Sequence, residues 1–354
     1  MRRWIVAILT LVCLVCNGCG DANVDSEEKT ELISEENSRL VIGFSQLGAE
    51  SDWRNANSDS MKQTFCEENG YELIFDDAQQ KQVNQITAIR NFIQQEVDYI
   101  ILAPVTETGW DTVLQEAKEA DIPVIIVDRM VDVEDQSLYT CWVGSDFYLE
   151  GQKAVAWLNT FLEKRGITPD QVHIANIQGT IGASAQIGRT KALENGVKKY
   201  GWDLLAEETG DYTQTKGREV MASYLEKYEN INVVYCENDN EAFGAIEAIE
   251  AAGRKVGYDI TNGEIMILSF DGGKAAMQEA LDGKIACVTE CNPLHGPRVQ
   301  GIIRTLEAGG TPKKATYAEE GIFSSIESIK TIQIDDESYD VTLLSEDVIE
   351  KRAY

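Results

Sequence analysis

The sequence is poor in the residues and motifs that most enzyme active sites use. It has only two histidines, His173 and His295, among its 354 residues. It contains no G-x-S-x-G nucleophile motif, no H-E-x-x-H zinc motif and no G-x-x-x-x-G-K-S/T phosphate loop. The small-residue segment 179–183 lacks the lysine of a phosphate loop. We therefore predict that the protein is not an enzyme and that it needs no cofactor and no metal.

Positive charge is scarce as well. The chain has 31 Lys and Arg residues against 60 Asp and Glu residues, and its formal net charge is −29 at pH 7. Proteins that bind nucleic acid need a basic surface for the phosphates, so this balance excludes that class. The negative charge fits a well-solvated protein in an extracellular setting and carries no information about the fold.

Long apolar runs are missing too, since no segment reaches the roughly 18 apolar residues that suggest a membrane helix. An apolar run of about 13 residues, 4–16, follows Arg2-Arg3 and has the length of a signal-peptide core. Gly18-Cys19 then resembles the lipobox of bacterial lipoproteins, in which the cysteine is acylated. We predict a signal peptide at 1–18, a lipid anchor at Cys19 and an acidic tether at 19–38. A plainly cleaved secretory peptide is the alternative.

The cysteines do not form a disulfide framework. Beyond Cys19 the chain has Cys66, Cys141, Cys236, Cys287 and Cys291, and no pair of them has the C-x2-C spacing of a zinc or redox site. Their number is odd, so at least one thiol is free. We expect small buried side chains, with a single bridge such as Cys287–Cys291 as the alternative.

Residues 75–129 show the organisation of the chain most clearly. Apolar residues recur there at spacings of three and four in two segments, Val83, Ile86, Ile89 and Ile93, and then Trp110, Val113, Leu114 and Ala117. These spacings predict two amphipathic helices. Segments 97–104 and 122–127 are continuous apolar runs, typical of strands buried on both faces. Strands of this kind that alternate with helices predict a parallel sheet covered on both sides.

The same alternation occurs in both halves of the chain. In the first half we predict strands at 40–45, 71–76 and 138–144, and a helix from near Trp53 to the Asn69-Gly70 stop. In the second half we predict strands at 172–177, 233–236, 265–270 and 285–289, and helices at 148–165, 185–200, 217–228, 241–252 and 297–308. The predicted fold class is therefore α/β, with two doubly wound Rossmann-like domains rather than one large sheet.

Polar and aromatic residues gather at the predicted carboxyl ends of the strands, where open α/β sheets bind ligands. Asp128-Arg129 ends an apolar strand abruptly and is the first candidate. The others are Gln46, the loop 50–54, Gln178, Arg189, Asp211-Tyr212, Asn238-Asp239 and Asp271. Carboxylates accept hydroxyl protons, guanidinium groups donate in a fixed fork, and aromatic rings cover the C–H side of a sugar. The set predicts a site for a neutral polyol, although Asp271 could instead cap a helix.

Six segments together are similar to the type I periplasmic sugar-binding proteins. They are ESDWR (50–54), QQKQVNQ (79–85), APVTETGW (103–110), DRMVD (128–132), QGTIGAS (178–184) and GDYT (210–213). The resemblance extends from about Val41 to Pro297 and is strongest to the galactofuranose-binding proteins of sugar ABC transporters. It implies two lobes joined by a three-stranded hinge, an N-terminal lobe of 39–144 plus about 293–322 and a C-terminal lobe of 145–292 plus about 323–354.

The resemblance also implies a function and a set of ligand-binding residues. The protein would be an extracytoplasmic monomer that closes on a monosaccharide, galactofuranose or a related furanose or pentose, and docks on an ABC permease in the membrane, to which the predicted lipid at Cys19 would anchor it. Trp53 and Arg54 would cover the sugar, and the residues at the other strand ends would bind its hydroxyls. Including Glu50 and Ser51 from the polar set at the strand ends, the predicted ligand-binding residues are Glu50, Ser51, Trp53, Arg54, Asp128, Arg129, Arg189, Tyr212, Asn238, Asp271 and Asn292.

Two other functions would use a similar site. A sensor subunit would present the sugar to a membrane sensor or chemoreceptor, and the sequence does not separate this use from transport. A transcription regulator would need a basic DNA-binding headpiece, which this acidic chain with its leader does not have. For the transport receptor we expect Arg129→Ala to weaken sugar binding by about tenfold or more, because the change would leave Asp128 without a charged partner.

Overall fold

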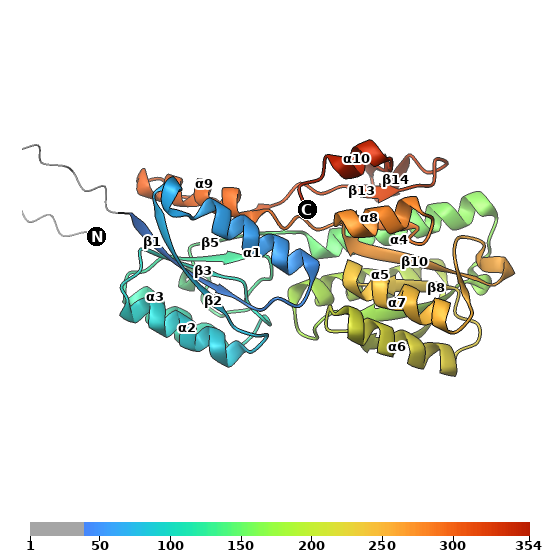
Figure 1. The fold of residues 1–354 in the computed structure, drawn as a ribbon, viewed down its shortest axis with the longest axis horizontal. Coiled ribbons are helices and arrows are strands. Elements are labelled where there is room, and N and C mark those ends of the chain that lie inside the picture. The colour runs from blue at the N-terminus through green and yellow to red at the C-terminus, as the bar shows by residue number, and fades with distance from the viewer. Residues whose placement is uncertain (1–38) are drawn as a thin grey trace, which may run out of the picture. The chain divides into compact units, whose positions relative to one another are not determined.

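The computed structural model describes residues 39–354 (Figure 1). The predicted signal peptide, the anchoring Cys19 and the acidic tether lie outside the described residues. Within residues 39–354, none of the helices combines the length and the apolar character that crossing a membrane requires.

The first sheet is fully parallel and has the strand order β12-β5-β4-β3-β1-β2. Its strands are β1 (Leu40–Gln46), β2 (Tyr71–Asp77), β3 (Tyr99–Leu102), β4 (Val124–Val127), β5 (Cys141–Gly144) and β12 (Ala315–Tyr317). Every residue of β3 and β4 is buried. This burial explains why their sequences are continuous apolar runs without polar alternation.

Helices cover both faces of this sheet. On one face lie α2 (Gln82–Gln94) and α3 (Asp111–Glu119), which bury Ile89, Val113 and Leu114. On the other face lie α1 (Asp52–Thr64) and α9 (His295–Glu307), as Figure 1 shows. α9 comes from much later in the chain than the other three, so the N-terminal lobe is built from separate segments of sequence.

The second sheet has the order β16-β13-β11-β10-β8-β6-β7, with β9 beside β10, and only β13 runs antiparallel to its neighbour β11. Its strands are β6 (His173–Gln178), β7 (Asp203–Thr209), β8 (Val233–Cys236), β9 (Lys255–Val256), β10 (Glu264–Asp271), β11 (Cys287–Glu290), β13 (Ile322–Ser324) and β16 (Thr342–Leu343). The two sheets, each flanked by helices, confirm the predicted α/β class with two parallel-sheet lobes.

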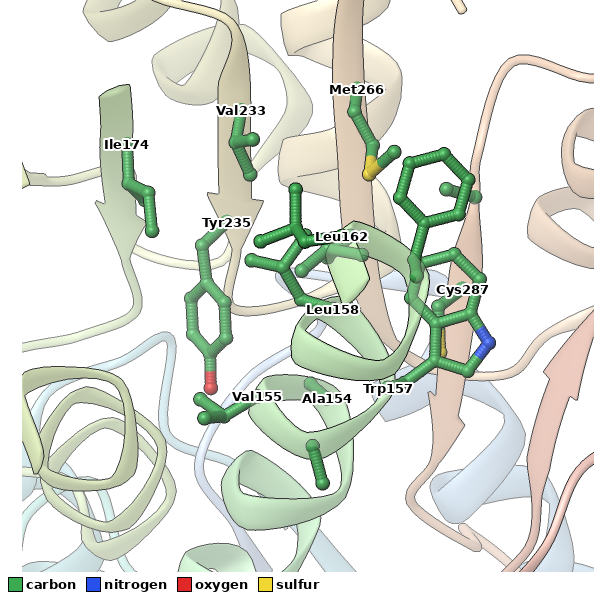
Figure 2. Close-up of a cluster of buried hydrophobic side chains, with 14 of the residues drawn as sticks. Ala154, Val155, Trp157, Leu158, Leu162, Ile174, Val233, Tyr235, Met266 and Cys287 are labelled. Carbon is green, nitrogen blue, oxygen red and sulfur yellow. The ribbon is translucent and has the colours of Figure 1, made fainter. Parts of the chain in front are cut away.

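Two apolar clusters hold helices against the faces of the second sheet. Figure 2 shows Trp157 and Leu158 of α4 packed beside Val233, Tyr235 and Met266 of the central strands. The helices of this lobe are α4 (Phe147–Arg165), α5 (Ser184–Tyr200), α6 (Gln214–Lys227), α7 (Asp239–Ala251), α8 (Lys274–Leu281) and α10 (Glu346–Glu350). The hairpin β14 (Thr331–Ile334) and β15 (Glu337–Asp340) packs on α4. Short 3-10 turns lie at Glu67–Asn69, Gln136–Leu138, Pro169–Gln171 and Ile260–Asn262.

Some predicted element boundaries are wrong. The helix predicted from Trp53 to Asn69 ends at Thr64, and a 3-10 turn with left-handed Gly70 (φ 86°) follows it. The strand predicted at 138–144 begins only at Cys141, because 136–138 form a 3-10 turn. β7 and α8 were not predicted at all. β7 is an edge strand with three exposed acidic residues, so it lacks the apolar run that marks the central strands.

Between residues 39 and 354, the chain passes between the two sheets three times. The crossings are residues 145–146 between β5 and α4, residues 291–294 between β11 and α9, and residues 318–321 between β12 and β13. We propose that the boundaries of the two lobes lie at these crossings. We call these three segments together the hinge.

Candidate functional site

A cavity lies where the carboxyl ends of strands from the two sheets face each other. It encloses about 290 Å³ of empty space, counting the part that opens to solvent. Asp128 follows β4, Asn238 follows β8 and Asp271 ends β10, so three strands deliver side chains to it. The lining residues are Glu50, Ser51, Trp53, Arg54, Asp128, Arg129, Phe147, Ala185, Arg189, Tyr212, Asn238, Asp271 and Cys291.

Of the eleven residues predicted from the sequence, ten line this cavity and Asn292 does not. The Asn292 side chain lies in the hinge, where its Oδ1 accepts hydrogen bonds from the Leu294 amide (3.0 Å) and Arg298 Nη1 (3.2 Å). The neighbouring residue Cys291 lines the cavity instead. Successive side chains of an extended segment point to opposite sides, so Cys291 faces the cavity and Asn292 does not.

Sequence reasoning missed Phe147, Ala185 and Cys291. All three are buried residues without a charged group, and a search for polar side chains at strand ends does not find them. Ala185 follows the small-residue segment 179–184, and Phe147 directly follows the first hinge crossing, which are the only signals in the sequence.

Arg54 is the centre of the N-terminal side of the site. Its guanidinium donates from Nη2 to Asp128 Oδ2 (2.7 Å) and from Nε to Glu50 Oε1 (3.1 Å), and all three side chains are at most 5% exposed. Ser51 Oγ accepts from the Arg54 amide (3.1 Å) and so caps the helix that carries Arg54. Burial alone would raise the pKa of Asp128, but Arg54 and Arg129 outweigh it and hold the pKa below its usual value.

The expected pairing of Asp128 with Arg129 is wrong. Arg129 Nη1 donates to the Val105 carbonyl (2.8 Å), Nη2 lies 3.7 Å from Glu50, and the guanidinium lies over the Tyr212 ring at 5.1 Å. The charged partner of Asp128 is Arg54. Asp128 would therefore keep its charged partner Arg54 if Arg129 were removed. The Arg129→Ala change would not weaken sugar binding by leaving Asp128 without a charged partner, as the sequence suggested.

Arg189 is the corresponding group on the C-terminal side. Its Nη2 lies 2.7 Å from Glu150 and 3.5 Å from Asp271 Oδ1, and Nη1 donates to the Glu237 carbonyl. Burial raises the pKa of Asp271 to about 6, although Arg189 opposes the rise. Asp271 also has a left-handed backbone (φ 93°), an unfavourable conformation that occurs often at ligand sites. Asp271 does not cap α8, because Gly273 occupies the cap position.

Aromatic groups and unpaired polar atoms complete the cavity. The Trp53 indole is 7% exposed and donates to the Cys291 carbonyl (2.7 Å). Tyr212 Oη and Glu50 Oε2 are buried atoms without a hydrogen-bond partner among residues 39–354, although buried polar groups usually have one. A polar ligand in the cavity would supply those partners. A side chain at Gly179 would collide with the Tyr212 ring at 1.9 Å, so glycine is required there.

The two lobes contact each other around the cavity. The Asp52 amide donates to Asn240 Oδ1 (3.1 Å), the Met130 amide donates to Ser184 Oγ (2.9 Å), and the Glu107 amide donates to the Gly182 carbonyl (3.1 Å). Each bond joins a residue of the N-terminal lobe to one of the C-terminal lobe. The structure therefore has a closed arrangement of the lobes.

The described cysteines form no disulfide, and the carboxylates of a nearby cluster already have partners within the protein. All five described cysteines are free, so the alternative of a Cys287–Cys291 bridge is wrong. Glu150, Cys291 and Glu320 place ligand-type atoms within 4.8 Å of one another. Glu150 already pairs with Arg189, and Glu320 Oε1 accepts from Ser145 Oγ and the Asn292 amide (2.7 Å). We assign this cluster to the hinge rather than to a metal.

Glu320 predicts a pH dependence of stability. Burial raises its pKa to about 7, against the hydrogen bonds from Ser145 and Asn292. The folded protein then holds a proton that the unfolded chain releases near pH 4.5, so this stabilisation is complete below pH 4.5 and is lost as the pH rises through about 7. Relative to wild type, Glu320→Gln should gain up to about 3 kcal/mol of unfolding free energy between pH 4.5 and 8, measured by urea denaturation. Parallel pH profiles of the two proteins would contradict this, and the exposed Glu319→Gln is the control.

Comparison with known proteins shows the family of this chain. A family model described as a periplasmic binding protein domain matches residues 42–294. The galactofuranose-binding protein YtfQ of Escherichia coli (strain K12) is 38% identical over 289 residues, which cover 80% of this chain and 87% of that protein.

Solved structures show the same relationship. A Mycobacterium smegmatis protein in complex with β-D-fucofuranose has a TM-score of 0.76 and 41% identity, covering 80% of this chain and 91% of that one. The periplasmic binding protein of the arabinose ABC transporter from Shewanella sp. ANA-3, bound to α- and β-L-arabinofuranose, has a TM-score of 0.74 and 39% identity over 80% and 91% of the two chains. The chain therefore belongs to the type I periplasmic sugar-binding proteins, a family of binding proteins rather than enzymes.

Proposed function

We propose that this protein is the extracytoplasmic substrate-binding subunit of a sugar ABC importer and that its two lobes close on a single furanose. Galactofuranose or a related furanose or pentose is the proposed ligand. The proposed contacts come from Glu50, Ser51, Trp53, Arg54, Asp128, Arg129, Arg189, Tyr212, Asn238 and Asp271.

The main support for this function is the arrangement of charged side chains around the cavity. Each lobe places a buried arginine with carboxylate partners on the same cavity, Arg54 with Asp128 and Glu50 on one side and Arg189 with Asp271 on the other. Such pairs offer fixed donors and acceptors whose charges already compensate each other, which suits a ligand that has many hydroxyl groups and no charge. Trp53 adds an aromatic face for the C–H side of the ring.

The choice of a five-membered ring rests on the relatives. YtfQ is named for galactofuranose, and the two related structures hold fucofuranose and arabinofuranose. These three proteins share 38–41% identity with this chain over 80% of its length. We infer that the feature common to their ligands, the furanose ring, is also what this site selects.

We further propose that Cys19 carries a lipid that anchors the protein outside the cell, and that the monomer docks on a membrane permease after closure. A ligand that contacts both lobes adds to the direct hydrogen bonds between them and shifts the equilibrium toward the closed arrangement, so closure reports that the sugar is bound. The support for the anchor is the sequence 1–19 alone. Palmitate labelling of the full chain and of Cys19→Ala would test it, with labelling expected only for the wild type.

Thermal unfolding of residues 39–354 against a panel of sugars tests the proposal. A sugar at 100 times its Kd should add about 2.7 kcal/mol to the unfolding free energy and raise Tm by several degrees. We expect this shift with D-galactose, L-arabinose or D-fucose, which can adopt the furanose form, and none with glycerol. Absence of a shift with every sugar would refute sugar binding.

A further inference from the structure

Arg352 and Tyr354 lie against the hinge although they are far from it in sequence. Arg352 Nη2 and Tyr354 Oη both donate to Glu290 Oε1, at 3.0 and 2.9 Å. Glu290 is the last residue of β11, and the second hinge crossing begins after it. The guanidinium of Arg352 also lies over the Phe323 ring at 5.0 Å. The end of the described chain is thus fastened to the C-terminal lobe by a buried ion pair.

Glu290 also connects these residues to the third hinge crossing, residues 318–321. Its Oε2 accepts from the Gly321 amide (2.8 Å), and its own amide donates to the Gly321 carbonyl (3.0 Å). The Glu290 side chain is only 10% exposed and Arg352 only 11%, so this carboxylate depends on Arg352 for charge compensation. Arg352 therefore stabilises the point where residues 291–294 and 318–321 leave the second sheet.

The same residues support the loop that carries Asp271. Asp271 pairs with Glu290 in the register of β10 and β11, and its carbonyl accepts from the Cys291 amide (3.1 Å). The Lys274 amide at the start of α8 donates to the Tyr354 carbonyl (3.1 Å). A Cβ at Gly272 would lie 3.4 Å from Arg352 Nη2. The loop 271–274 is thus held between the ligand cavity on one side and Arg352 and Tyr354 on the other.

This support matters because the loop is strained. Asp271 and Gly272 both have left-handed backbones, with φ of 93° and 80°. A non-glycine residue in this conformation persists only when its surroundings impose it. Tyr354 also lines a second cavity with Trp53 and Asp271, which encloses about 600 Å³ of empty space including its opening to solvent, so it reaches the side of the cleft that both lobes form.

We propose that Arg352 and Tyr354 are positioning residues for sugar binding. They do not touch the ligand cavity, and they act through Glu290 and the 271–274 loop to hold Asp271 and the hinge in the arrangement that binds the sugar. The inference rests on the proposed function.

The test compares Arg352→Ala and Tyr354→Phe with the exposed control Lys351→Ala. Sugar affinity is measured by calorimetry well below Tm, where all variants are folded. Arg352→Ala should weaken binding about tenfold, Tyr354→Phe two- to threefold, and Lys351→Ala should bind like wild type. A merely structural role would lower Tm and leave the affinity unchanged, and that result would overturn the proposal. If Arg352→Ala does not fold, the sugar affinity of Tyr354→Phe decides between the two outcomes, because this variant loses only one hydroxyl group and keeps the rest of the packing.

A second readout separates this proposal from the proposed function. If wild type and Lys351→Ala bind no sugar, the proposed function fails and the positioning role is judged by hydrogen exchange. Arg352→Ala should then speed exchange of the amides of Lys274, Cys291 and Gly321 at least tenfold, while Lys351→Ala should not. Unchanged exchange at all three amides would overturn the positioning role independently of any ligand.

Discussion

Replacing Arg54 by alanine should weaken sugar binding by at least about 100-fold. The change leaves the buried carboxylates of Asp128 and Glu50 without their closest cation and removes the guanidinium that lies 4.6 Å from the Trp53 ring centre. Breaking a buried pair by removing one partner costs about 3–5 kcal/mol, and each 1.4 kcal/mol that falls on the bound state is a factor of ten in Kd. Calorimetric titration of residues 39–354 measures the loss.

Two variants control for charge and for surface effects. Arg54→Lys keeps the charge but cannot bridge Asp128 and Glu50 with one planar fork, so its affinity should lie between those of wild type and Arg54→Ala. Arg90→Ala removes an exposed pair with Glu116 (2.8 Å) in the same lobe and should leave binding unchanged. An Arg54→Ala protein that binds within threefold of wild type would show that this pair is only structural.

Arg189→Ala should have an effect of similar size from the opposite lobe. Arg189 pairs with Glu150 at 2.7 Å and approaches Asp271 at 3.5 Å, and its own side chain is 2% exposed. Burial already raises the pKa of Glu150 and of Asp271, and Arg189 opposes both rises. Without Arg189 the pKa of both carboxyl groups should rise further, and a protonated Asp271 would accept fewer hydrogen bonds from a sugar. We expect a loss of about 100-fold in affinity.

The matched control for Arg189 is Arg218→Ala in the same lobe, an exposed residue 3.8 Å from Glu247. It should change neither the affinity nor the stability by more than about 1 kcal/mol. If the Arg189 and Arg54 variants weaken binding to very different extents, the ligand is held mainly by one lobe, and the proposal that closure reports binding would be contradicted.

Much of the site could be predicted because parallel strands end at the same edge of a sheet. Asp128 and Asp271 stand directly after apolar runs in the sequence, so their meeting at one cleft follows from the α/β fold. The pairing within the cleft could not be predicted. Arg129 is adjacent to Asp128 in sequence, yet Arg54 reaches Asp128 because α1 places its guanidinium across the end of β4. Sequence proximity does not decide which of two arginines a carboxylate meets.

Features without a periodic or polar signal were missed. Cys291 and Phe147 line the cavity as buried side chains without charge. Neighbouring side chains of an extended segment point to opposite sides, so Cys291 faces the cavity and the predicted Asn292 does not. Arg352 and Tyr354 contact Glu290, which lies more than sixty positions earlier in the chain. A contact of this kind arises only from the packing of the whole lobe, so no local pattern predicts it.

Carbon-13 NMR of D-galactose labelled at C1 tests the central claim most directly. Furanose and pyranose forms give separate anomeric signals, so the spectrum with residues 39–354 at equal concentration identifies the ring that is bound. We predict a furanose signal that shifts or broadens with the wild type and stays unchanged with Arg54→Ala. A bound pyranose signal, or the same spectrum with both proteins, would contradict closure of the two lobes on a furanose.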